Sequence, residues 1–333
     1  MKMRLFPCLV LATTVMGFTA SQAQQFTMRL SSPTVNDAPH EWMKQFKAGV
    51  EQRTNGKIKV ELYPASQLGQ IPSTVDGVAL GTIEFAIPAT GFLIGLEPRF
   101  QVFDAAGLFD SVEQSQKTLA DPEVRKRLAS FGETRGVELL VIGNNGPLMA
   151  VSYKAIRTVA DFKGQKIRVP GAAPLHVEPF KKLGALPLSI PLGEVLPALQ
   201  NKTIDASISS FNVLTGFKYY DVTKTATYLP KQFLFVGGIV NRNFMKSIGS
   251  DMAAIVREEA QKAALVFASF GVEDVERTRD IWVKSGGEAI TLPPAEAEAY
   301  LANVTSAIPA VLAKDTQMKL DYEAMMAAGK KYR

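Results

Sequence analysis

The arginine within residues 164–171, GQKIRVPG, is the residue of this chain best suited to hold a ligand. Arg168 stands between Ile167 and Val169, and no Asp or Glu occurs in the six residues that follow it. A guanidinium group presents a planar fork of N–H donors that matches the two oxygens of a carboxylate. Because a buried guanidinium without an anion is costly, a ligand carboxylate would relieve it. A surface arginine paired with a local Asp or Glu is the alternative that the pattern leaves open.

Residues typical of catalysis or metal binding are sparse. The two histidines, His40 and His176, stand in no metal-ligand spacing, and no H-E-x-x-H, G-x-S-x-G or phosphate-loop pattern occurs. We therefore expect each histidine to be a surface or helix-cap residue. The one cysteine, Cys8, lies in the apolar segment near the N-terminus. The sequence predicts a protein that is not an enzyme and that holds neither a metal nor a cofactor.

The N-terminal segment has the pattern of a secretory signal peptide. Residues 1–4 are basic, residues 5–20 are mostly apolar and uncharged, and small residues follow at the positions that a signal peptidase reads. The pattern predicts a signal peptide over residues 1–23, cleaved after Ala23, and export of the remaining chain. No later run of about 18 uncharged apolar residues occurs.

The charge balance argues against a nucleic-acid partner. The 333 residues carry a net charge of +5, and loss of Lys2 and Arg4 with the signal peptide would leave +3. Basic runs are short, as in Arg125-Lys126-Arg127. Because nucleic-acid binding would require a basic stripe with interleaved aromatic residues, we interpret these runs as solvated helix faces.

Strands and helices alternate along the chain in two series. Predicted strands cover residues 26–31, 57–63, 83–87, 137–142, 148–153, 187–190 and 204–209, and predicted helices cover residues 37–54, 72–80, 112–135, 175–183 and 194–200. This alternation is typical of mostly parallel sheets with helices on both faces. Residues 250–285 predict one long helix of roughly 50 Å, which would bridge two domains and leave a cleft between them.

Four segments, taken together, resemble a known family. They are GKIKVELYPASQLG (residues 56–69), DFKGQKIRVPGA (161–172), EVLPALQNKTIDA (194–206) and KYYDVTKT (218–225). In order and spacing they resemble the solute-binding receptors of TRAP transporters, the bacterial extracellular solute-binding proteins of family 7. The resemblance extends over residues 26–330.

The resemblance implies a fold, a function and a partner. The implied fold is the α/β two-lobe fold of periplasmic binding proteins, in which each lobe is a mixed sheet flanked by helices and a long helix crosses the hinge. The implied function is the capture of a small organic acid in the periplasm and its delivery to TRAP membrane permease subunits by a monomeric receptor. In the family, the arginine of the K-I-R-V-P segment binds the ligand carboxylate, and that position is Arg168 here.

The expected lobe boundaries follow from the same resemblance. Lobe I comprises residues 24–146 and 236–270, and lobe II comprises residues 147–235 and 271–315. A C-terminal helix covers residues 316–333.

Five positions depart from the polar pocket of the sugar-acid members of the family. By alignment of the flanking motifs these positions are Leu148, Ile71, Ala89, Ser209 and Leu192, and four of the five changes remove a charge or a hydrogen-bonding amide. A buried hydroxyl without a partner costs about 1–3 kcal/mol, whereas apolar surface gains about 25 cal/mol per Å² on burial. We therefore expect a monocarboxylate with an apolar or aromatic body.

Further candidates to contact the ligand are aromatic residues and one amide. Phe211, Tyr219, Phe92 and Trp42 are the aromatic candidates, of which Phe211 is favoured because it follows the strand that bears Ser209. Asn212, together with Ser209, is a candidate for a second hydrogen bond to the ligand.

Two functions of other classes stay open at this point. Because a fold does not dictate a function, a secreted enzyme on the same two-lobe scaffold is one alternative. A sensor receptor that reports its ligand to a signalling partner is the other.

Overall fold

The computed structural model describes residues 25–333, apart from the side chains of residues 271–273. The predicted signal peptide, residues 1–23, lies outside the described residues. Within residues 25–333 no helix combines the length and the apolar character that crossing a membrane requires.

The first strands and helices alternate as expected. Strand β1 (Phe26–Ser31) pairs in parallel with β2 (Ile58–Tyr63) and with β3 (Phe85–Ala86). Between them lie α1 (Ala38–Arg53) and α2 (Ile71–Leu80). The N-terminus of α1 is capped by the Asp37 carboxylate, which accepts a hydrogen bond from the backbone N–H of His40.

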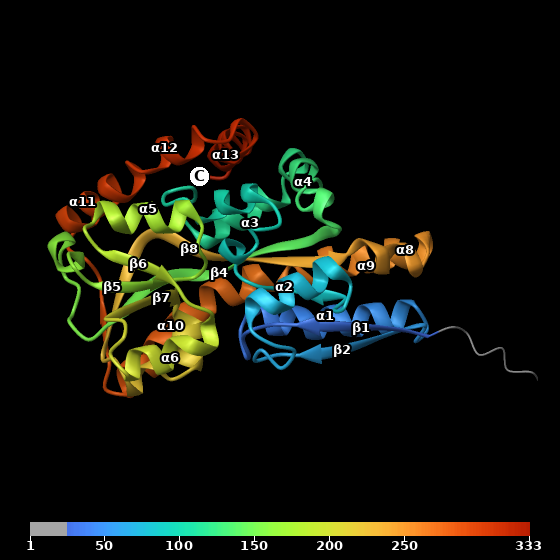
Figure 1. Cartoon of the computed structure of the whole chain (residues 1–333), viewed down its shortest axis with the longest axis horizontal. Coiled ribbons are helices and arrows are strands. Elements are labelled where there is room, and N and C mark those ends of the chain that lie inside the picture. Colours follow the sequence, from blue (N-terminus) through green and yellow to red (C-terminus); the bar gives the residue numbers. More distant parts are fainter. Residues whose placement is uncertain (1–24) are drawn as a thin grey trace, which may run out of the picture.

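One nine-stranded sheet runs through the whole molecule (Figure 1). Its order is β2-β1-β3-β8-β4-β7-β5-β6, and β9 pairs with β8. The remaining strands are β4 (Val137–Ser152), β5 (Lys166–Val169), β6 (Leu186–Ser189), β7 (Ala206–Ser210), β8 (Thr225–Asn241) and β9 (Glu288–Ile290). Strands β4 and β8 are antiparallel and join the two groups of strands. This mixed sheet with flanking helices confirms the α/β class.

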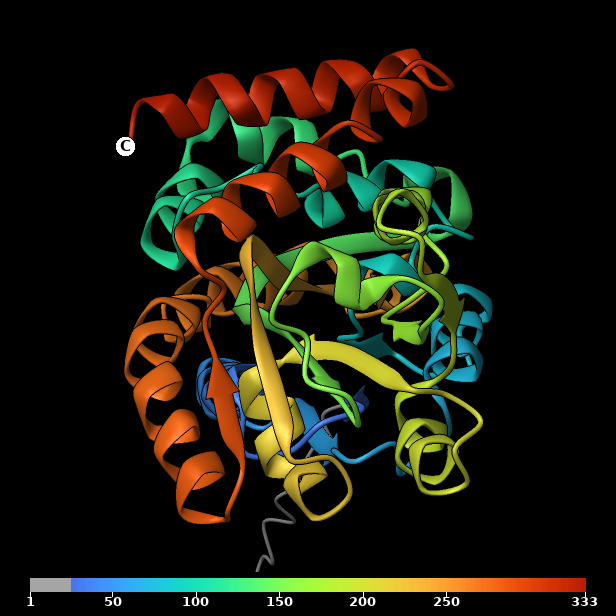
Figure 2. The same ribbon diagram turned by 90° about the vertical axis from the view of Figure 1, so that its left-hand side faces the viewer.

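Helices flank the sheet on both sides, and the last three lie together along one side of the molecule (Figure 2). Besides α1 and α2, the α-helices of the described residues are α3 (Val112–Ala120), α4 (Pro122–Leu128), α5 (Pro174–Lys182), α6 (Leu192–Gln200), α7 (Phe211–Gly216), α8 (Arg242–Ser247), α9 (Ser250–Ala263), α10 (Val266–Lys284), α11 (Pro294–Thr305), α12 (Ile308–Leu312) and α13 (Thr316–Lys330). The 3-10 helices include η1 (Thr90–Phe92) and η2 (Pro98–Asp104).

The long helix predicted over residues 250–285 is wrong as a single element, because α9 ends at Ala263 and α10 begins at Val266. The break has no glycine or proline, and helix α10 continues through residue 271. Just after the break, the ring of Phe267 packs so closely on β4 that a Cβ at Gly143 would lie 2.4 Å from it. Close packing of this ring on the sheet therefore accompanies the change of direction.

Strand β4 is irregular around residues 144–149, beyond a first register shift against β8 between Leu139 and Val141. Its register against β8 shifts between Asn144 and Pro147 and again between Pro147 and Met149, and Gly146 has a φ of +103°. A left-handed φ of this kind favours glycine. The irregularity falls at residues 146 and 147, where the boundary between the lobes is predicted.

Candidate ligand-binding site

Arg168 lies on the short strand β5, between β6 and β7, and is buried with 1% of its surface exposed. Its Nε donates to the carbonyl of Ile190 at 3.0 Å, and one terminal nitrogen donates to the carbonyl of Ile208 at 3.0 Å. These two backbone acceptors fix the direction of the side chain without neutralising it. In the described part of the chain, Arg168 forms no ion pair with Asp or Glu; the only charge effect on its pKa comes from Tyr219. The alternative of a surface arginine with a local acidic partner is therefore wrong.

Burial disfavours the charged form of this guanidinium. It lowers the pKa of Arg168 from its ordinary value to about 10, so the group still carries its charge at neutral pH. A carboxylate brought next to it would stabilise the charged form again. The site therefore favours an anion.

A cavity lies against the guanidinium, and we call it the Arg168 cavity. Its volume is about 30 Å³. It is lined by Pro33, Thr34, Ile71, Ile87, Ala89, Phe92, Asn145, Arg168, Pro170, Leu192, Ser209, Val213, Leu234 and Val236. Most of these side chains are apolar, and they come from both sides of the predicted lobe boundary.

Two helices begin at the cavity. Ile71 is the first residue of α2 and Leu192 is the first residue of α6, and neither helix has a side-chain cap at its N-terminus. The free N–H groups at such ends carry a partial positive charge, which favours a nearby anion. The helix ends therefore act in the same direction as Arg168.

The structure brings together five of the eight residues predicted for the site. Arg168, Ile71, Ala89, Leu192 and Ser209 all line the Arg168 cavity. A direct contact of each with a ligand stays a prediction.

The other three predicted residues do not line this cavity. Leu148 is buried in the core, where it pairs with Ser210 of β7. The ring of Phe211 lies 5.6 Å from that of Trp282 and belongs to the core as well. Asn212 donates to the side-chain oxygen of Asn145 at 3.2 Å. The side chains of Leu148 and Phe211 are thus occupied by packing.

Among the aromatic candidates, Phe92 is the one at the cavity. Trp42 stacks against both Phe46 and Phe85 and donates to the carbonyl of Ala260 at 3.1 Å. Tyr219 is buried in the cluster around Trp282. Phe92 is the last residue of the short helix η1, which follows β3, and folding brings η1 to the cavity that Arg168 lines.

Asn145 is a cavity residue that the sequence did not predict. It lies at the irregular part of β4, and its Nδ2 is 3.3 Å from Asp37 Oδ2 and 3.4 Å from Ser210 Oγ. Burial raises the pKa of Asp37. The segment N-N-G-P resembles a turn between two strands, but the structure continues it as one strand.

The expectation for the histidines is right for one and wrong for the other. His40 lies in the first turn of α1, where its Nδ1 accepts from the N–H of Asn36 at 3.0 Å. His176 is 1% exposed, and its Nδ1 lies 3.6 Å from Asp104 Oδ1. Burial lowers the pKa of His176 to about 3 and raises that of Asp104 well above its usual range. The pair lies next to Pro170, at the end of the strand that carries Arg168.

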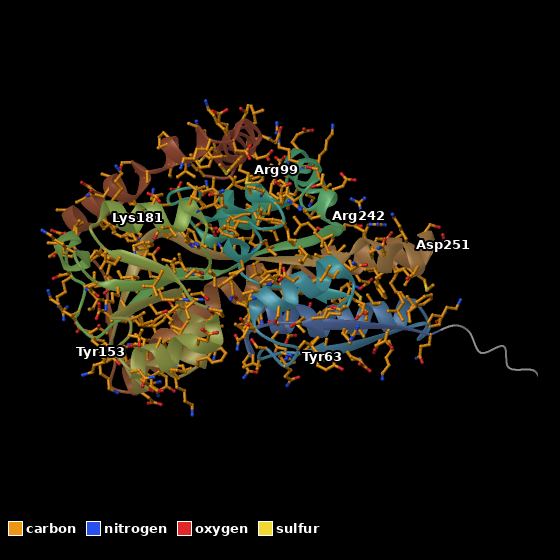
Figure 3. All side chains as sticks on the ribbon, viewed as in Figure 1. Tyr63, Arg99, Tyr153, Lys181, Arg242 and Asp251 are labelled. Carbon is orange, nitrogen blue, oxygen red and sulfur yellow. The ribbon has the colours of Figure 1, made fainter. Side chains whose placement is uncertain are left out.

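A larger hollow lies over the first half of β4, and we call it the β4 groove. It has a volume of about 550 Å³ and lies between α3 and α4 on one side and α9 and α10 on the other. Arg242, which Figure 3 labels, belongs to it and forms an ion pair with Glu133 at 2.9 Å. Arg257 pairs with Glu138 at 2.5 Å. In the described residues no group of three or more His, Cys, Asp or Glu side chains is placed to hold a metal.

Known proteins resemble the chain over nearly its whole length. The family model of the bacterial extracellular solute-binding proteins, family 7, matches residues 31–315. The 2,3-diketo-L-gulonate-binding periplasmic protein YiaO of Escherichia coli (strain K12) is 28% identical over 293 residues, which cover 87% of this chain and 89% of the relative. The C4-dicarboxylate-binding periplasmic protein DctP of Rhodobacter capsulatus is 28% identical over 233 residues, 69% of each protein.

Solved structures share the fold. A TRAP periplasmic solute binding protein from Desulfovibrio salexigens, crystallised with bound orotic acid, matches with a TM-score of 0.85 at 24% identity. The match covers 92% of this chain and 100% of that one. It confirms the predicted two-lobe α/β fold.

Proposed function

The chain belongs to the bacterial extracellular solute-binding proteins of family 7, the receptors of TRAP transporters, and from this premise we propose that its solute is an organic monocarboxylate with an apolar or aromatic body. The observation that carries the proposal is Arg168, a buried guanidinium that faces the Arg168 cavity and has no anionic partner in the described chain. A ligand carboxylate supplies that partner.

The ligands named for the relatives fit this role of Arg168. Diketogulonate, C4-dicarboxylates and orotic acid each carry a carboxyl group. The common element is the anion, whereas the rest of these molecules differs. A fixed arginine for the carboxylate and a variable wall for the remainder account for both facts.

The wall of the Arg168 cavity favours an apolar body. Apart from Arg168, the polar side chains that line it are Thr34, Asn145 and Ser209. Asn145 is already engaged with Asp37 and Ser210. A polyhydroxylated acid would therefore bury hydroxyl groups that lack partners, at about 1–3 kcal/mol each, whereas methyl or aromatic groups would gain from burial. Keto acids with branched side chains and aromatic acids meet these conditions.

The proposed cycle begins in the periplasm. An acid enters between the open lobes, Arg168 binds its carboxylate, and the lobes close about the hinge. Closure is favoured only by as much as the ligand binds the closed form better than the open one. The closed receptor, as a monomer, then docks on the TRAP permease subunits and delivers the acid.

A thermal-shift screen of the mature chain against organic acids tests the proposal. The panel holds aromatic acids, branched keto acids, dicarboxylates and sugar acids, because a bound ligand raises the melting temperature by mass action. We expect the largest shifts with the apolar monocarboxylates, confirmed by calorimetry. Shifts confined to sugar acids or dicarboxylates would contradict the apolar assignment, and conversion of an acid into a product, seen by mass spectrometry, would favour an enzyme.

A further inference from the structure

The Arg168 cavity is closed on one side by a contact between two backbone segments. A Cβ built on Gly91 of η1 would lie 2.5 Å from the carbonyl oxygen of Pro170. A Cβ built on Gly171 would lie 2.3 Å from the carbonyl carbon of Gly91. Neither position has room for even a methyl group. The two segments can therefore approach this closely only because both residues are glycines.

These two segments belong to opposite sides of the predicted lobe boundary. Gly91 lies between Ala89 and Phe92, which both line the cavity, in predicted lobe I. Pro170 and Gly171 directly follow β5, which carries Arg168, in predicted lobe II. The distance between the two segments therefore sets the distance between the guanidinium and the opposite wall of the cavity.

A second contact closes another side, but it is softer. A Cβ built on Gly193 would lie 2.6 Å from Gln70 Nε2. Gln70 precedes Ile71 and Gly193 follows Leu192, and both of these neighbours line the cavity. Because the end of a glutamine side chain can move aside, a substitution here is tolerated more easily than one at Gly91, where the obstacle is backbone.

We propose that Gly91 is a positioning residue that sets how far the lobes close over Arg168, an inference that rests on the proposed function. Carbon and oxygen atoms approach to about 3.3 Å at the closest common contacts, so a methyl at 2.5 Å would hold the segments apart by nearly 1 Å. A bidentate carboxylate site tolerates errors of about 0.5 Å. Closure that stops early therefore leaves the ligand incompletely bound.

The Gly91→Ala variant tests this proposal without a known ligand, because closure can be followed through a pair of introduced cysteines. The mature chain beyond Ala23 contains no cysteine of its own. A disulfide between cysteines introduced as Gln70→Cys and Gly193→Cys requires the two segments to approach at least as closely as they do here, where Gln70 Cδ would lie 3.2 Å from a Cβ at Gly193. We measure the rate of this disulfide in the presence of copper phenanthroline on non-reducing gels. The matched control is Gly95→Ala, since a Cβ at Gly95 would meet nothing within 4 Å.

We expect the disulfide to form at the same rate in the parent and in Gly95→Ala, and at least tenfold more slowly in Gly91→Ala. The melting temperature of the unliganded Gly91→Ala protein should stay within about 2 °C of the parent. Equal rates in all three proteins, no disulfide in the parent, or a large loss of melting temperature in Gly91→Ala would each overturn the proposal. In the last case the contact would belong to the fold and not to closure.

The same proteins separate this inference from the proposed function. With benzoate and 4-methyl-2-oxopentanoate as probes, we expect weaker binding by at least tenfold in Gly91→Ala, with faster dissociation. If the disulfide rates behave as expected but the parent binds no acid of the screen, the proposed function fails and the role of Gly91 in closure stands.

Discussion

The Arg168 cavity and the β4 groove differ in size and in electrostatics: the smaller hollow contains the buried arginine that has no carboxylate partner in the described chain. The groove is much the larger, at about 550 Å³ against about 30 Å³. Of the three arginines that line it, Arg242 and Arg257 are paired with carboxylates of the same chain and Arg125 is exposed to solvent; Arg257 keeps 49% of its side chain exposed. Arg168 is buried and, in the described chain, without a carboxylate. The larger volume is thus found in the β4 groove, whereas the buried charge without a carboxylate partner among the described residues is found at the Arg168 cavity.

The pKa values express the same difference. Burial lowers the pKa of Arg168 to about 10, whereas hydrogen bonding to Glu138 raises the pKa of Arg257. The charge of Arg257 is already stabilised by a partner and by water, so an incoming anion gains little from it. In the described chain two backbone carbonyl groups, and no carboxylate, accept hydrogen bonds from Arg168, so an anion gains more. A binding site is therefore better recognised by a desolvated charge without a counter-ion than by the size of a hollow.

The largest expected effect comes from removing each arginine in turn. Arg168→Ala should weaken binding of the preferred acid by at least about 30-fold, because truncation of one member of a buried charge pair costs about 2–5 kcal/mol. Arg168→Lys should not restore affinity, since an ammonium group lacks the bidentate fork. Calorimetry on the purified variants measures both.

Arg257→Ala serves as the control, and its affinity should match that of the parent. A loss of affinity in Arg257→Ala with no loss in Arg168→Ala would reverse the comparison and move the site to the β4 groove. The melting temperature of unliganded Arg168→Ala should stay near that of the parent, which separates loss of binding from loss of fold.

The second effect is a dependence of affinity on pH. The carboxylate prefers the charged guanidinium, so affinity should be constant from about pH 6 to pH 9 and fall as pH rises through the pKa of about 10 of free Arg168. Well above that value the fall should approach tenfold per pH unit. Titration calorimetry between pH 7 and pH 10.5, with circular dichroism to verify folding, measures it. Affinity that instead rises over this range would show that Arg168 does not bind the anion.

Much of this fold follows from local patterns. Alternation of apolar residues and the cap at Asp37 predict β1, α1 and β2 because these elements depend on their own residues. Strand β8 is not predicted, since Pro230 and the pair Gly237-Gly238 resemble a turn. The structure gives the reason for one of these glycines: a Cβ at Gly238 would lie 2.6 Å from the side chain of Val141.

The candidate site likewise has one part that the sequence predicts and one part that it does not. Arg168 could be predicted because its surroundings in the sequence lack acidic residues, and the structure keeps it away from them. Phe211 is favoured over Phe92 in the sequence because it is close to Ser209, but Phe92 and not Phe211 lines the cavity. Phe211 begins α7, and there its ring packs 5.6 Å from that of Trp282 and does not line the cavity. Such a direction is set by tertiary packing.

A smaller effect is expected from the apolar wall. Leu192→Ser removes an apolar side chain that is 8% exposed and lines the Arg168 cavity, so it should weaken binding of an apolar monocarboxylate by about 1–2 kcal/mol, or roughly 5- to 30-fold. Leu265→Ser, in the β4 groove and 74% exposed, should leave affinity unchanged. Direct binding measurements with one aromatic and one hydroxylated acid test this, and an equal loss for both acids would argue against an apolar contact at Leu192.

The smallest expected effect concerns the stability of the β4 groove. Arg257→Ala breaks the pair with Glu138, but solvent screens a side chain that is 49% exposed, so the free energy of unfolding should fall by less than about 1 kcal/mol. Urea denaturation of the unliganded protein measures it, with Glu138→Gln as the reciprocal variant. A loss above about 2 kcal/mol in both variants would mean that the pair is effectively buried. In that case exposure would no longer distinguish the two arginines, and only the presence of a carboxylate partner at Arg257 would set the groove apart from the Arg168 cavity.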